Sequence, residues 1–184
     1  MKKWIVHLLV VFLLCGCGGV EDVSPGLNLR QCIGNSDGCK FVAAITADYG
    51  DRVYDFTTDC SWKPGEGLAF ELTYPETIAG ITGTIDQKGG KLTFDDTILM
   101  FDSMSQGSIM PAMGPWLMMK AVTGGYIHGT SHSEPISITY DDSFQGELLR
   151  IVLELDQNSL PNFCEIYMNE RRILSIRIEA FQVL

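Results

Sequence analysis

Two histidines and a glutamate lie close together in the segment HGTSHSE, which contains His128, His132 and Glu134. If this segment were helical, the two histidines would share one face and could bind zinc. Gly129 within the segment and Pro135 directly after it favour a loop instead. We therefore expect solvated loop histidines and no metal site at this position.

Two pairs of adjacent aspartates, Asp95–Asp96 and Asp141–Asp142, carry groups suited to acid–base work or calcium binding. Neither pair has the spaced oxygen ligands of a calcium loop, and adjacent residues point to different faces of a strand. Aspartates of this kind commonly cap turns. The chain also lacks a G-x-S-x-G elbow, a phosphate-binding glycine loop and a nucleophilic Cys/His pairing. The sequence thus predicts no enzyme, no cofactor and no metal.

Four cysteines follow the N-terminal region, and in an oxidising compartment they could form two disulfides by any of three pairings. Cys32 and Cys39 flank the turn-rich segment IGNSDG, which favours a bridge between them. Cys60 and Cys164 would then form the second bridge. Because none of the four belongs to a C-x-x-C pair, the spacing does not favour a zinc site.

The first residues are typical of a bacterial lipoprotein signal. Lys2 and Lys3 precede the short apolar core WIVHLLVVFLL, and LCGC follows it, so that a small residue comes directly before Cys17. We expect residues 1–16 to be removed and Cys17 to carry acyl chains, including palmitate, in place of an ordinary secretory cleavage. Residues 17–38 would form a lipidated N-terminus and tether, which places the protein in the cell envelope on the extracytoplasmic side of a membrane.

The charge of the chain excludes one class of partner. The whole sequence has 13 lysines and arginines against 23 aspartates and glutamates, and removal of Lys2 and Lys3 leaves a net charge of −12. Such a surface repels nucleic acid. The expected partners are the membrane, a lipid or lipoprotein acyl chain, and an envelope protein.

Most of the sequence from Lys40 onward alternates apolar and polar residues, as half-buried strands do. The segment KFVAAITADY, the turn Gly50–Asp51 and RVYDFTTDC predict a hairpin, and LAFELTY ends at Pro75. Further alternating segments are IAGITGTI, KLTF, TILMF, PISITY, LLRIVLEL, FCEIYM and RRILSIRIEAF. We count roughly ten strands and no internal repeat.

Between Ser108 and Gly124 the apolar residues follow a helical period, with Pro111 or Pro115 in the first turn. This helix is apolar nearly all round, so it must be covered on several sides. We therefore predict an α+β fold: one strongly curved antiparallel sheet, an open or incomplete barrel, with one or two helices in its concave face.

Six of the eight methionines fall between Met100 and Met119. Methionine is flexible and polarizable, so a helix that covers a cavity for variable acyl chains would favour it. Two alternatives remain open. The methionines could fill an ordinary core around a bent sheet, or their thioethers could bind copper(I), although no cysteine or histidine in the run supports this.

The order of elements resembles the lipoprotein-carrier superfamily that includes LolA, LolB and the mycobacterial-type lipid-binding lipoproteins. A lipidated leader is followed by FELTYPETIAGITGTI, by the proline-containing apolar helix and by a final meander with SLPNF. The resemblance covers residues 39–184, which we expect to form one domain. It implies an unclosed barrel around an apolar cavity, with helices as its lid. Soluble carriers are not acylated, so a membrane-tethered acceptor or lipid-holding protein fits this chain better.

We therefore hypothesise a membrane-anchored lipoprotein that binds a lipid or acyl chain in the apolar hollow of its sheet. The residues expected to line the hollow from the sheet are Phe70, Leu72, Tyr74, Ile81 and Ile85. Those expected from the helix are Met110, Met113, Trp116, Leu117 and Met119. The alternative is an interaction or scaffold lipoprotein of the envelope, with a filled core, no ligand and an acidic outer face for a partner.

Overall fold

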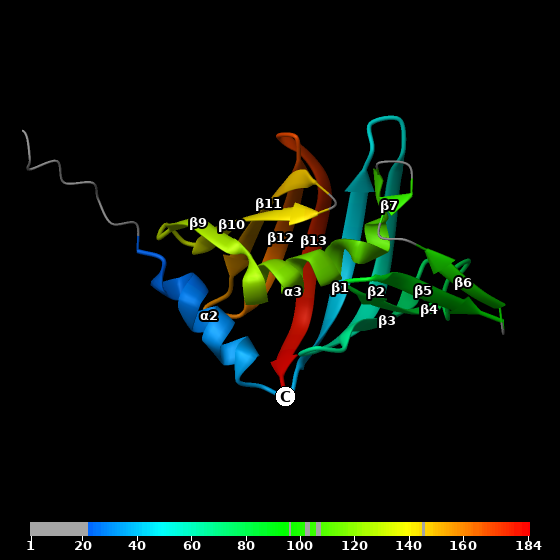
Figure 1. Cartoon of the computed structure of the whole chain (residues 1–184), viewed down its shortest axis with the longest axis horizontal. Coiled ribbons are helices and arrows are strands. Elements are labelled where there is room, and N and C mark those ends of the chain that lie inside the picture. The colour runs from blue at the N-terminus through cyan, green and yellow to red at the C-terminus, as the bar shows by residue number, and fades with distance from the viewer. Residues whose placement is uncertain (1–21, 96, 102–103, 106–107, 145) are drawn as a thin grey trace, which may run out of the picture.

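The computed structural model describes residues 22–184 except 96, 102–103, 106–107 and 145. The predicted signal peptide and the acylation site Cys17 therefore lie outside the described residues, and both remain predictions. Within the described part, the chain folds into one large antiparallel sheet with two α-helices. Figure 1 shows helix α3 crossing the sheet while helix α2 lies beside the β9–β10 end.

Eleven strands form this sheet, in the order β6-β5-β4-β3-β2-β1-β13-β12-β11-β10-β9, so that each neighbouring pair except β1–β13 consists of consecutive strands. The first half contains β1 (Cys39–Asp48), β2 (Val53–Lys63), β3 (Gly67–Tyr74), β4 (Thr82–Asp86), β5 (Gly89–Phe94) and β6 (Thr97–Phe101). The second half contains β9 (Tyr126–Ser131), β10 (Ser137–Phe144), β11 (Glu147–Leu155), β12 (Pro161–Met168) and β13 (Arg171–Val183). The predicted α+β fold with an open, curved sheet is confirmed.

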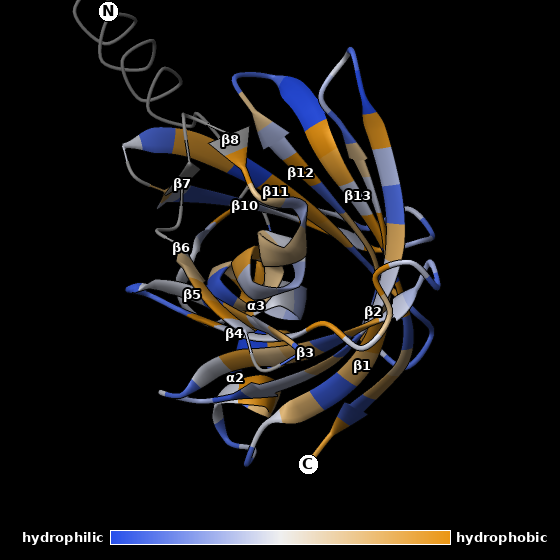
Figure 2. Ribbon diagram, turned by 90° about the vertical axis from the view of Figure 1, so that its right-hand side faces the viewer, coloured by the Kyte–Doolittle hydropathy of each residue, from blue (hydrophilic) through white to orange (hydrophobic). Residues whose placement is uncertain are grey.

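The curvature of the sheet creates an inner and an outer face, and the alternation of each strand assigns its side chains to them. In β1, Phe41, Ala43 and Ile45 are buried on the inner face, while the residues between them are more exposed. Figure 2 looks along the hollow and shows α3 inside it, surrounded by the strands. Alternate residues of β1 to β4 and of β10 to β13 are buried around α3, and together they form a single hydrophobic core.

Helix α3 (Gly114–Gly124) is shorter than the predicted helix over residues 108–124. Ser108–Ile109 form strand β8, which pairs with β7 (Met104–Ser105), and Pro111–Met113 form a single 3₁₀ turn. Two prolines explain the later start, because each removes a backbone donor and Pro115 suits the first turn of α3.

The segment expected as a tether is partly helical, which corrects the predicted extent of residues 17–38. Helix α2 (Ser24–Gly34) buries Gly26, Leu29 and Ile33 against the rest of the domain. A Cβ on Gly26 would approach Ile127 Cδ1 to 2.9 Å and Ile138 Cγ2 to 3.2 Å, so α2 packs closely on β9 and β10. Neither helix in the described part of the chain is long and apolar enough to cross a membrane.

The segment HGTSHSE, predicted as a loop, instead begins within strand β9. Gly129 pairs with Thr139 of β10, and a register shift separates this pair from the pair of Ile127 with Tyr140. Pairing with β10 on one side and packing of α2 on the other override the local preference of glycine for a loop.

Candidate functional site

Helix α3 is packed inside the hollow of the sheet, with most of its side chains buried. Eight of its eleven residues are buried: Gly114, Pro115, Trp116, Leu117, Met118, Met119, Ala121 and Val122. The ring of Trp116 packs edge-on against Phe144, with centroids 5.8 Å apart. Met119 Sδ lies 4.0 Å from Cys39 Sγ at the start of β1. These contacts hold the helix between the two halves of the sheet.

Both ends of α3 are fixed by specific features. At the N-terminus, Gly114 lies against β13, because a Cβ there would approach Ile176 Cδ1 to 2.9 Å and Leu174 Cδ1 to 3.1 Å. At the C-terminus, Arg30 of α2 donates to Val122 O at 2.8 Å, to Ala121 O at 3.4 Å and also to Gly125 O. A guanidinium there satisfies terminal carbonyls and interacts favourably with the helix dipole. Helix α3 is therefore bound to both the sheet and α2.

The residues predicted to form the lid have different environments. Met113, Leu117 and Met119 are completely buried, and Trp116 is nearly so. Met110 is only partly buried at the edge of the core. In this structure the methionines of the helix thus fill space between α3 and the sheet, and Met110 alone among the five predicted residues borders the surface.

The predicted residues of the sheet also differ in how deeply they are buried. Phe70 and Leu72 of β3 and Ile85 of β4 are buried on the inner face. The Phe70 ring lies over Gly83, where a Cβ would come within 2.5 Å of the ring. Ile81 is partly buried, and Tyr74 is 58% exposed. Phe70, Leu72 and Ile85 therefore belong to the core, and Ile81 lies at its border. The prediction for Tyr74 is wrong, because a register shift pairs it with Thr57 on the outer face of the sheet.

An apolar part of the inner face on β4 to β6 stays exposed or only partly buried, and we call it the open wall. It consists of Ile81, Leu92, Phe94 and Leu99. The register defines it: Leu92 lies opposite Gly83 on one side and Leu99 on the other, which carries the inner face of β3 across to β6. Phe94 is 48% exposed and Leu99 is 62% exposed. The sequence predicted Ile81 and missed Leu92, Phe94 and Leu99, although KLTF and TILMF showed the alternation that could have identified them.

The four cysteines are free in this structure, so neither predicted disulfide is formed. Cys32 lies exposed on α2, whereas Cys39 is buried beside Met119. Cys60 and Cys164 lie on β2 and β12, which β1 and β13 separate. At about 4.8 Å per strand their backbones are roughly 14 Å apart, which is too far for a bridge. Burial raises the pKa of Cys39 to about 12 and raises those of Cys60 and Cys164 further.

The two histidines of HGTSHSE are held by different carboxylates. His128 Nδ1 lies 2.9 Å from Asp141 Oδ2, and His132 Nε2 lies 3.7 Å from Asp22 Oδ2. Asp141 also accepts a hydrogen bond from Arg150, and Asp142 accepts one from Lys120. Among the residues that the structure describes, no three His, Cys, Asp or Glu side chains gather as metal ligands.

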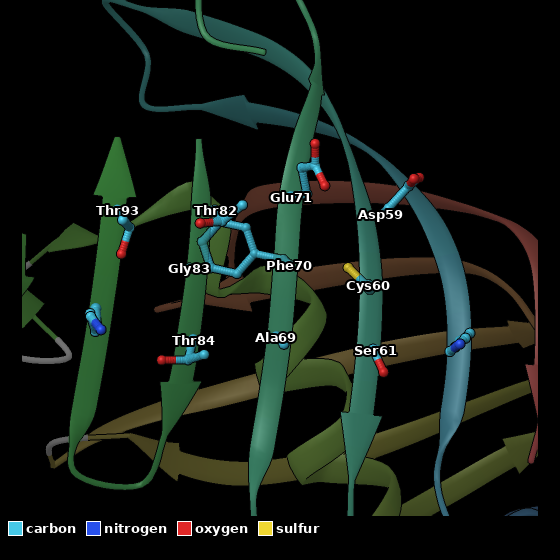
Figure 3. A pocket seen from close by; sticks show the side chains of 12 residues that line it. Asp59, Cys60, Ser61, Ala69, Phe70, Glu71, Thr82, Gly83, Thr84 and Thr93 are labelled. Carbon is cyan, nitrogen blue, oxygen red and sulfur yellow. The ribbon is translucent and has the colours of Figure 1, made fainter. Parts of the chain in front are cut away.

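A groove of about 560 Å³ crosses the outer face of β1 to β5. Figure 3 shows its lining, with Asp59 and Glu71 at one end and Thr82, Thr84 and Thr93 along the strands beside them. Asp59 pairs directly with Glu71, so two like charges face each other across β2 and β3. Most of the residues that line this groove are polar, and the groove is open to solvent.

A second pocket, of about 450 Å³, lies between α3 and the turns that follow β2 and β4. Trp62 and Trp116 contribute apolar surface, and Lys63, Lys88 and Lys120 line the same pocket. We call it the lysine pocket. It lies at the end of the sheet that these turns form, where Trp116, Lys120 and Thr123 of α3 approach them.

The architecture matches solved structures with very different sequences. A domain from Vibrio parahaemolyticus named for outer membrane lipoprotein sorting aligns with a TM-score of 0.53 and 4% identity, over 88% of this chain and 91% of that chain. The fold is LolA-like. A DUF1329 family protein from Desulfovibrio piger gives 0.51 with 9% identity, over 89% and 94% of the two chains. A LolA superfamily protein from Nitrosomonas europaea aligns at 0.47 with 12% identity, over 90% and 94%.

No protein-family model matches the sequence, and no curated protein is similar enough to match it. The likeness therefore concerns the LolA-like fold and carries no residue-level assignment. The site of this chain has to be argued from its own side chains.

Proposed function

We propose that the protein is an envelope lipoprotein, anchored through acylated Cys17, that binds an acyl chain along the open wall. One observation carries this proposal: large apolar side chains remain exposed on the concave face, directly continuous with the core. Contiguous exposed apolar surface typically marks a binding site. The LolA-like fold and the lipoprotein signal in the sequence support the same function.

The contact area makes such binding energetically sufficient. Burial of apolar surface contributes about 25 cal/mol per Å², so burying much of one acyl chain gives an affinity on the order of micromolar. The chain would lie against Leu92, Phe94 and Leu99, with Met110 at the border of α3. Methionine adapts its shape at low cost, so Met110 suits a boundary that has to fit acyl chains of different lengths.

The completely buried methionines of α3 favour a second function, in which the core is filled and the protein binds no lipid. The polar groove on the outer face would then be the surface for an envelope partner. The two functions differ in one property, which is whether an apolar ligand enters the concave face.

Fatty acid binding to the mature chain, residues 17–184 produced without lipidation, tests the proposal. A brominated fatty acid should quench the fluorescence of Trp62 and Trp116, and an organic extract of the purified protein should contain lipid. The variant Leu99→Asp should weaken quenching by about tenfold or more, because it places a charge against the acyl chain. Met100→Asp is the matched control, since Met100 lies on the same strand, is 81% exposed and points to the outer face.

Both variants should keep the circular dichroism spectrum of the parent chain, because both positions are exposed. Quenching that is equal in the two variants would place the ligand elsewhere. The absence of quenching in the parent chain, together with a lipid-free extract, would favour the scaffold function.

A further inference from the structure

The lysine pocket gathers cations in a protein that is acidic overall. The chain has a formal net charge of −10, yet Lys63, Lys88 and Lys120 line one pocket. The apolar surface of Trp62 and Trp116 lies in the same place. A site that combines cations with aromatic surface suits a ligand that is charged at one end and apolar next to it.

Two of these three lysines keep their charge available for a ligand. Lys120 Nζ is engaged, since it donates to Asp142 Oδ2 at 2.8 Å and to Ser143 O at 2.9 Å. Lys63 Nζ lies 3.5 Å from Glu66 Oε2, but both side chains are largely exposed, and pairs of this kind contribute little. Within the part of the chain that the structure describes, Lys88 forms no ion pair.

Asp86 is the one acidic residue that lines the pocket, and its carboxylate accepts hydrogen bonds from the backbone of its own turn. Asp86 Oδ1 accepts backbone N–H groups from Lys88 at 2.7 Å and from Gly89 at 3.2 Å. These hydrogen bonds fix the turn between β4 and β5 and hold Lys88 at its tip. The lining therefore presents more positive than negative charge to an incoming group.

The lysine pocket lies beside the turn between β4 and β5, and Phe94 of the open wall lies at the other end of β5. Strand β5 leads from the turn beside Lys88 to Phe94, and at about 3.4 Å per residue the five steps from Gly89 to Phe94 span roughly 17 Å. Gly90 lies between them on the inner face, opposite Ile85, and both residues are buried. The span from the pocket to the wall thus matches the length of one extended acyl chain, which would have to displace the side chains that cover Gly90.

We infer that the lysine pocket binds the anionic headgroup of an amphiphile, with phosphate the preferred group, while its acyl chain lies along the open wall. This inference rests on the function proposed above and adds to it the chemical class of the ligand and its direction. Lys63 and Lys88 would neutralise the headgroup, and the two tryptophans would contact the first part of the acyl chain.

Two amphiphiles with the same acyl chain test the inference on the mature chain: lysophosphatidate and the uncharged monoacylglycerol. We expect lysophosphatidate to bind about tenfold more tightly, with a preference that falls as salt is added. The double variant Lys63→Gln/Lys88→Gln should abolish the preference and leave monoacylglycerol binding unchanged. Lys91→Gln is the control, because Lys91 is exposed on the outer face of β5. Bromine near the headgroup should quench Trp62 and Trp116 more than bromine near the methyl end.

The outcomes separate the two claims. Equal binding of both amphiphiles, unchanged in the double variant, would overturn the headgroup site while acyl-chain binding stands. Failure of both to bind would overturn the proposed function, and the inference with it. Inorganic phosphate alone should not displace bound lysophosphatidate at equal concentration. Displacement would mean that the pocket binds free phosphate and that the acyl chain is not part of the ligand.

Discussion

Tyr140 is a polar side chain inside the apolar core. The residue is completely buried on β10, and its hydroxyl has no hydrogen-bond partner among the described residues. Burial raises the pKa of Tyr140, and the nearby charge of Arg30 opposes that rise. A buried hydroxyl without a partner costs about 1–3 kcal/mol of desolvation. Tyr140 therefore lowers the stability of the core in which it lies.

The variant Tyr140→Phe should raise the free energy of unfolding by about 1 kcal/mol, because it removes the unpaired hydroxyl and keeps the ring. Urea denaturation measures this change. The matched control is Thr58→Val, which should lower the free energy by about 1 kcal/mol, since the buried Thr58 hydroxyl donates to Glu71 O at 2.9 Å. Destabilisation by Tyr140→Phe would show that the hydroxyl has a partner, such as a buried water.

At the scale of elements, α2 and α3 are joined by Arg30, whose side chain reaches the C-terminal carbonyls of α3. The two helices are far apart in sequence, and α2 has few buried residues of its own. The hydrogen bonds of Arg30 thus connect α2, the described helix nearest to the predicted membrane anchor, with α3 inside the hollow.

Replacement of Arg30 by glutamine should lower the free energy of unfolding by about 2 kcal/mol, the range of hydrogen bonds from charged groups. Hydrogen exchange should quicken in the last turn of α3, while the amides that pair β1 with β13 keep their protection. Arg177→Gln, at an exposed position of the central strand β13, is the control and should change the free energy by less than about 0.5 kcal/mol. Equal effects of the two variants would contradict a specific role for Arg30 in holding α3.

The strands were predictable because each buries one face, which leaves the alternation visible in segments such as PISITY and LLRIVLEL. Helix α2 was not, because only Gly26, Leu29 and Ile33 are buried in a stretch that is otherwise polar. The environment of α3 could not be predicted either. A helix that is apolar all round must be covered, but the curvature of the sheet decides whether it fills the hollow or covers an empty one. The open wall depends on register, which places Leu92 opposite Leu99.

For the molecule as a whole, the buried thiols couple stability to alkaline pH. The ordinary pKa of the Cys39 thiol is 9.0, and burial raises it to about 12. Below pH 9 the folded and unfolded chains are both protonated at this thiol, so the stability is complete. Above pH 9 the unfolded chain releases the proton first, so the free energy of unfolding falls as pH rises toward 12. Burial raises the pKa of Cys60 and of Cys164 in the same direction.

Urea denaturation under reducing conditions should therefore show stability that is constant between pH 7 and 8 and decreases above pH 9. Each buried thiol contributes about 1.4 kcal/mol per pH unit in that range. The variant Cys164→Ala should show a shallower decrease, whereas Cys32→Ala should keep the slope, because Cys32 is exposed. A Cys164→Ala slope equal to that of the parent would mean that the Cys164 thiol ionises in the folded protein as readily as in the unfolded one.

Because α2 begins at Ser24, the segment between the proposed anchor and the folded domain is short. A flexible linker over residues 17–38 could extend about 75 Å, whereas the seven steps from Cys17 to Ser24 span at most about 25 Å. A protein tethered so closely cannot travel between two membranes while its anchor stays inserted. It would bind its ligand at the surface of the bilayer in which it is anchored. A second, mobile molecule would then have to carry the ligand to or from that surface.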